Sequence, residues 1–157
     1  MQPTSKKALL SSTPEQQQLI LGLSLKGSGR WSTKEIGELT KLSLIHVLHL
    51  DLTRIGMRAP GVQHLISKTS PFKNVTSLDL SWNPIRDAGV GHLVSNDTFR
   101  NVVSLKLNHA QISPNGVLHL VSETSPFKAE YPHGFVPPES VVRKLAATAW
   151  WEQRKYA

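Results

Sequence analysis

The sequence predicts an α/β fold, a short right-handed solenoid of about four strand-turn-helix repeats with a parallel sheet on its concave face and a C-terminal helical tail. Three observations predict this fold. Leu-x-Leu strand signals recur with periods of 28 and 27 residues, an apolar pattern with helical spacing follows each of them, and the last thirty residues lose the repeat.

The three clearest copies of the repeat align without gaps from the strand to the helix. Their Leu-x-Leu signals begin at Leu50, Leu78 and Leu105. The positions that coincide are Gly61, Gly89 and Gly116; Val62, Val90 and Val117; His64, His92 and His119; Leu65, Leu93 and Leu120; and, in the closing loop, Phe72, Phe99 and Phe127. Identity at so many equivalent positions indicates copies of one structural unit.

Each unit reads as strand, turn and helix. In 75–94, Val75, Leu78 and Leu80 face one side of a short strand while Asp79 alternates to the other. The pair Asn83-Pro84 then ends the strand. Ile85, Val90, Leu93 and Val94 follow with helical spacing, and Asp87 favours a helix start.

A fourth, degraded copy lies upstream, and the segments outside the repeats differ in character. ILGLSL (20–25) matches the strand signal, and STKEIGELTKL (32–42) matches the helix if one extra residue is allowed. The expected organisation is an N-terminal tail or cap at 1–19, a repeat domain at 20–129, a Pro-rich connector at 130–139 and an amphipathic helix at 140–157. First repeats are often atypical because they cap the core.

The segment VTSLDLSWNPIRDAGVGHL resembles a leucine-rich repeat of the pattern LxxLxLxxNxLxxxGxxxL, in the longer, helix-bearing, ribonuclease-inhibitor-like variety. The resemblance covers residues 20–128 and implies repeats stacked into a curved arc, with little implication for chemistry. One departure concerns the asparagine that such repeats use to tie adjacent turns. It is present only as Asn83, and the equivalent residues are Ser28, Ile55 and Ala110, so no amide ladder is expected at this position.

Composition limits the function. Eighteen Lys and Arg against eleven Asp and Glu give a net charge of +7, which favours nucleic acid, an anionic membrane or an acidic protein as partner. The absence of cysteine excludes disulfides, cysteine-ligated zinc and thiol catalysis. The sequence contains no apolar run of 18 residues, so it predicts no transmembrane helix. We expect no metal, because His64, His92 and His119 lie on successive helices about 10 Å apart.

Three groups of residues are candidate interaction sites. On the concave face, the row Arg54, Trp82 and His109 combines an aromatic ring with cation-capable neighbours, beside Asp51, Asp79 and Lys106. On the C-terminal helix, the candidates are Trp150, Trp151, Arg154 and Tyr156. Along one edge of the arc, Lys73, Arg100 and Lys128 each follow a buried phenylalanine and could contact phosphate. The C-terminal helix either caps the solenoid or docks on a partner.

These features favour a non-catalytic scaffolding subunit of a larger assembly, without cofactor, small-molecule substrate or catalytic residues. By charge and analogy, a mitochondrial ribosome comes first, followed by another mitochondrial complex. The alternative is a basic protein that binds the RNA backbone, and the third candidate is an axonemal or cytoskeletal structural protein. A basic, Ser/Thr-rich N-terminus favours the mitochondrial matrix, and otherwise the cytoplasm is expected.

Overall fold

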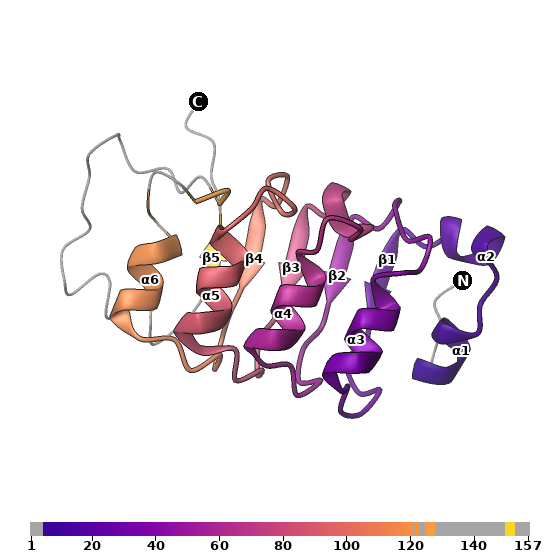
Figure 1. Ribbon diagram of the computed structural model, residues 1–157, viewed down its shortest axis with the longest axis horizontal. Helices are drawn as coiled ribbons and strands as arrows, with labels where there is room; N and C mark the ends of the chain where they lie inside the picture. Colours follow the sequence, from indigo (N-terminus) through magenta and orange to yellow (C-terminus); the bar gives the residue numbers. More distant parts are fainter. Residues whose placement is uncertain (1–4, 121, 123–124, 128–149, 153–157) are drawn as a thin grey trace.

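The computed structural model describes residues 5–120, 122, 125–127 and 150–152 (Figure 1). Four strands pair in parallel, in the order of the chain: β1 (Gly22–Ser24), β2 (His49–Asp51), β3 (Ser77–Asp79) and β4 (Ser104–Lys106). The register places Leu23, Leu50, Leu78 and Leu105 side by side, as the sequence alignment requires. The predicted α/β fold with a parallel sheet is therefore confirmed.

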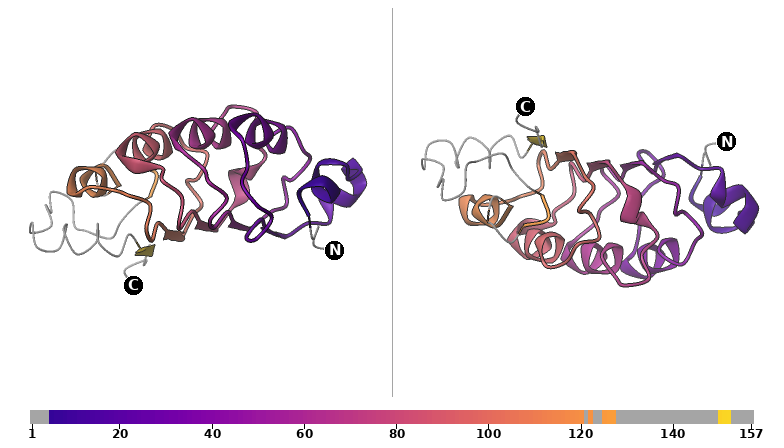
Figure 2. Two further views of the ribbon diagram at one scale, coloured as in Figure 1. Left: turned by 90° about the horizontal axis from the view of Figure 1, so that it is seen from below. Right: turned by 90° about the horizontal axis from the view of Figure 1, so that it is seen from above.

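A helix follows each of these strands: α3 (Thr33–Leu39), α4 (Ala59–Leu65), α5 (Arg86–Val94) and α6 (Pro114–Leu120). Figure 2 shows the helices along one side of the molecule and the strands along the other. Each helix contacts the next one, α3 to α4, α4 to α5 and α5 to α6. The strand-helix units therefore stack side by side, and the core lies between the sheet and the helices.

The core consists of the residues that the repeat keeps constant. Phe72, which belongs to a 3₁₀ turn η1 (Phe72–Asn74), is fully buried, and so are Phe99 and Phe127 from the equivalent loops. The strand leucines and the helix valines and leucines lie against them. Since burial of one large apolar side chain contributes about 1.5–3 kcal/mol, repetition of the same buried set in each turn explains why the sequence repeats.

Asn83 ties two adjacent turns together. Its side chain is fully buried, and its Oδ1 accepts hydrogen bonds from the backbone amides of Ile55 at 3.1 Å and Met57 at 2.9 Å. Its Nδ2 donates to the carbonyl oxygen of Leu52 at 2.8 Å in the previous turn and to that of Leu80 at 3.0 Å in its own. The equivalent Ile55 and Ala110 are buried and apolar, so this tie is not repeated at either position.

Residues 5–19 form two short helices, although the sequence of this segment shows no clear amphipathic helix. They are α1 (Lys6–Leu10) and α2 (Pro14–Gln18), which Ser5 and Thr13 cap at their N-termini. Leu9 is fully buried in the core, and the buried Gln17 accepts a hydrogen bond from the Ser43 amide at 2.7 Å. This segment therefore packs against the first strand-helix unit.

At residues 150–152 the structure differs from the helix predicted over 140–157. Residues Trp150–Glu152 form strand β5, which pairs antiparallel with β4 and aligns Lys106 with Trp150. The prediction of a helix through these three residues is wrong because it counted helical periodicity alone. Consecutive tryptophans also favour a strand, and β4 offers its free edge as a pairing partner. The remainder of the predicted helix, with Arg154 and Tyr156, lies outside the described residues.

Candidate functional site

Arg54, Trp82 and His109 lie in one row on the turns that follow β2, β3 and β4. The ring of His109 stacks on that of Trp82, with centroids 3.8 Å apart and planes 24° apart. The guanidinium carbon of Arg54 lies 6.0 Å from the centre of the Trp82 ring. Trp82 is nevertheless 52% exposed. The structure therefore brings the three predicted residues together as a stacked, solvent-facing group.

The backbone at this row is held in an unfavourable conformation. Arg54, Trp82 and His109 have φ angles of 58°, 61° and 55°, in the left-handed region, whereas the first turn has Gly27 at the equivalent position with φ of 80°. A non-glycine residue there costs about 1–2 kcal/mol. The Arg54 amide donates to the Ser81 carbonyl at 3.0 Å, and the Trp82 amide donates to the Asn108 carbonyl at 2.7 Å. These bonds to the neighbouring turn maintain the conformation.

Asp51, Asp79 and Lys106 lie side by side on the three strands that precede this row. Burial raises the pKa of Asp51, but hydrogen bonds from Thr53 and Ser24 outweigh it and leave the pKa below the ordinary value. The Ser24 hydroxyl donates to Asp51 Oδ2 at 3.0 Å, and the Ser81 amide donates to Asp79 Oδ1 at 2.9 Å. Both carboxylates therefore stabilise the turns and add negative charge to the sheet face.

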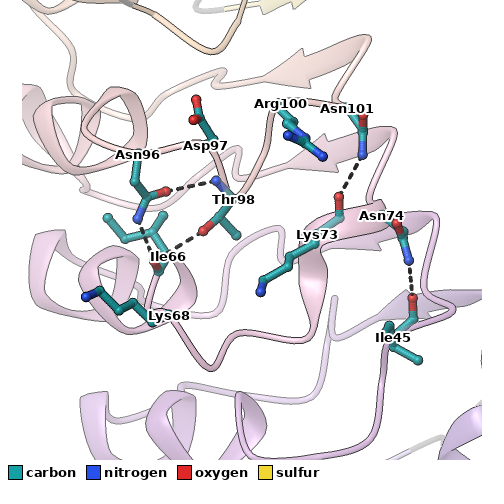
Figure 3. A pocket seen from close by; sticks show the side chains of 10 residues that line it. All are labelled: Ile45, Ile66, Lys68, Lys73, Asn74, Asn96, Asp97, Thr98, Arg100 and Asn101. Carbon is teal, nitrogen blue, oxygen red and sulfur yellow. Dashed lines mark hydrogen bonds between the residues drawn. The ribbon is translucent and has the colours of Figure 1, made fainter.

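A groove of about 590 Å³ lies at the opposite end of the strands, between the loops that lead into β3 and β4 (Figure 3). The residues that line it are Ile45, Ile66, Lys68, Lys73, Asn74, Asn96, Asp97, Thr98, Arg100 and Asn101. Two of the three predicted edge cations, Lys73 and Arg100, are thus on this groove. The third, Lys128, lies outside the described residues.

The amide hydrogen bonds that hold these loops were not among the features predicted from the sequence. Asn74 Nδ2 donates to the Ile45 carbonyl at 2.9 Å, and Asn101 Nδ2 donates to the Lys73 carbonyl at 2.9 Å (Figure 3). Each bond joins one turn to the preceding turn. The signal was present in the sequence, because an asparagine follows the cation in both TSPFKN and DTFRN. The chain thus has a short amide ladder at the loop edge, although none forms at the position of Asn83.

The remaining candidates are placed as follows. His64 and His119 are exposed and His92 is half-buried, each on its own helix. Within the described residues, no three His, Asp or Glu side chains gather in a way that could hold a metal ion. In the same part of the chain, no helix has the length and apolar character to cross a membrane. Trp150 and Trp151 are in β5, and nothing further is described of their side chains.

Comparison with known protein families places a match within the repeat region. A family model described as "Leucine Rich repeat" matches residues 73–94, which span the loop before β3, the strand itself and helix α5. The match confirms the resemblance of this segment to a leucine-rich repeat. A search of curated proteins finds no match to the chain.

Proposed function

We propose that this chain, which carries a leucine-rich repeat at residues 73–94, is a short solenoid that acts as a scaffolding subunit and binds a protein partner through its sheet face. Leucine-rich repeats are in general non-catalytic protein-interaction modules, and solenoids use extended curved surfaces for binding. Parallel strands joined through helices give right-handed turns. Repeats of 27 and 28 residues, each with a helix, favour the ribonuclease-inhibitor-like subtype.

The observation that carries the proposal is the stacked row Arg54, Trp82 and His109. Tryptophan and arginine are the side chains that contribute most to protein interfaces. Trp82 is half exposed, and its ring is stacked on His109 with the Arg54 guanidinium 6.0 Å away. Side chains already packed on one another lose less entropy when a partner binds. Three large side chains also occupy left-handed positions where glycine would be more favourable. Backbone strain of this kind concentrates at functional sites.

The charges on the sheet face support selectivity. Asp51 and Asp79 are adjacent on β2 and β3, and Lys106 follows on β4. A partner surface with a basic patch beside an acidic one would complement this pattern, and complementary charge contributes mainly to specificity and association rate. The expectation of a mitochondrial or axonemal assembly rests on net charge and analogy alone, and the proposed interface does not depend on it.

The variant Trp82→Gly tests the proposed interface. It removes the exposed ring and at the same time relieves the left-handed backbone, so the loss of stacking, about 0.5–1.5 kcal/mol, is offset by about 1 kcal/mol of released strain. We expect the free energy of unfolding in urea to remain within about 1 kcal/mol of the original. Proteins that co-purify from native extract and cross-link to the original chain should be lost.

The matched control is Leu118→Ser, which removes an exposed apolar side chain on α6 instead. It should leave the set of co-purifying proteins unchanged. If Trp82→Gly retains every cross-linked partner, or if the control loses the same partners, the sheet-face row is not the interface.

A further inference from the structure

Cations line the groove between the loops before β3 and β4, and none of them has an ion-pair partner among the residues that the structure describes. Lys68, Lys73 and Arg100 line it, against the single carboxylate of Asp97. Within the described residues, ion pairs join Lys6 to Glu35 and Lys41 to Glu38, and none involves a side chain of the groove. The groove therefore presents an excess of positive charge to whatever enters it.

The walls of the groove are fixed in place. Asn101 ties the loop before β4 to Lys73, and Asn74 ties the loop before β3 to Ile45. On the other side, Asn96 and Thr98 both donate to the carbonyl oxygen of Ile66, at 2.6 Å and 3.2 Å. Figure 3 shows Lys73 extending from its loop towards the side on which Ile66 lies. A preformed groove loses little entropy when it binds a ligand.

The floor and rim of the groove are partly apolar. Ile66 is buried, whereas Ile45 is 51% exposed although it is a large aliphatic side chain. A volume of about 590 Å³ is within the usual range for binding pockets. None of the described residues that line the groove is aromatic, so they offer no ring on which a base could stack, as bases do in proteins that bind single-stranded nucleic acid. The combination of cations and exposed aliphatic surface fits acidic and apolar side chains together.

We propose that this groove is a second docking site, which binds an extended acidic segment of a partner protein. Its glutamate or aspartate side chains would pair with Lys73 and Arg100, and an apolar side chain would lie against Ile45. The site is separate from the sheet-face row, because it precedes the strands and the row follows them. The two sites can therefore be tested independently, and Trp82→Gly should not affect the groove.

The test measures fluorescence anisotropy of a short labelled peptide of alternating glutamate and leucine at low ionic strength. The double variant Lys73→Glu with Arg100→Glu should weaken binding at least about tenfold. The control Lys34→Glu with Arg58→Glu makes the same change in total charge at exposed positions away from the groove, and should weaken binding much less. A peptide of alternating glutamine and leucine should not bind, and added salt should weaken the binding of the acidic peptide.

Three results would overturn the proposal: no binding of the acidic peptide to the original chain, equal weakening by both double variants, or no weakening by the groove variant. A single-stranded RNA of similar length is measured in parallel. If the RNA binds more tightly than the peptide and its binding is lost only in the groove variant, the ligand is nucleic acid and the assignment to an acidic peptide is wrong. The pair Lys73→Gln with Arg100→Gln repeats the comparison without introducing new charges.

Discussion

Single residues at defined positions of the repeat join one turn to the next. Asn83 does so in the core with bonds from both ends of its amide, whereas Asn74 and Asn101 do so at the loop edge with one bond each. The alignment identified Asn83 as the one asparagine at its position of the repeat. It gave no indication of how many backbone groups depend on that side chain, because those groups come from two different turns.

Asn83→Ala is expected to destabilise the protein by at least about 3 kcal/mol. The substitution leaves the amides of Ile55 and Met57 and the carbonyl of Leu52 without their partner in a fully buried position, and each such loss costs about 1–3 kcal/mol. Urea unfolding followed by circular dichroism measures the change. The half-buried Asn108, with no side-chain hydrogen bond described, is the control. If Asn108→Ala costs as much as Asn83→Ala, the tie between the turns is not the cause.

At the scale of the element, the glycine shared by the helices sets how closely each helix can pack. A Cβ at Gly89 in α5 would lie 2.7 Å from Cβ of Ile85, which cannot move without the backbone. At Gly61, a Cβ would lie 2.8 Å from Ile36 of the preceding helix, and at Gly116 it would lie closer still to Asp87 of α5. The alignment shows only that three copies share a glycine at this position. The crowding residue at Gly89 is local in the chain, whereas Ile36, which crowds Gly61 from the preceding helix, comes from the tertiary structure.

Two glycines of α5 allow a comparison within one helix. Gly89→Ala should destabilise the protein by about 1–3 kcal/mol, because the new methyl group meets a packed neighbour. Gly91→Ala meets nothing within 4 Å and should stabilise it by up to about 1 kcal/mol, since alanine favours the helix. Thermal unfolding of both variants shows whether each substitution lowers or raises the stability of the protein. Equal effects would show that helix propensity, and not packing, decides at Gly89.

At the scale of the whole molecule, an ion pair joins the N-terminal segment to the first strand-helix unit. Lys6 Nζ lies 2.8 Å from Glu35 Oε1 and 5.1 Å from the centre of the Trp31 ring. Glu35 also accepts from the Ser32 amide at 2.7 Å, which completes the capping box of α3. Lys6, followed by Ser32, lowers the pKa of Glu35 to about 2. No pattern in the sequence predicted a contact between Lys6 and Glu35, which lie far apart in the chain.

This pKa predicts a loss of stability in acid. Because the pKa of Glu35 is lowered on folding from 4.5 to about 2, its contribution is fully present above pH 4.5 and is lost as pH falls from there towards 2. Urea unfolding across this range should show Lys6→Gln less stable than the original chain near neutral pH, with the difference shrinking in acid. Lys7→Gln, at an exposed position on the same helix, is the control. A difference that does not depend on pH would rule out the ion pair as its origin.

The sequence by itself determined the repeat unit, the parallel order of the strands and the positions of the buried leucines, valines and phenylalanines. It could do so because each unit is local in the chain and its period fixes which positions meet. The tertiary structure alone decided the stacking of Trp82 on His109, the amide ties across the groove, the pairing of Lys6 with Glu35 and the strand at residues 150–152. These contacts depend on side-chain direction and on segments that the period does not relate. Only the amide ties left a repeated signal in the sequence, the asparagine that follows the cation in two of the loops.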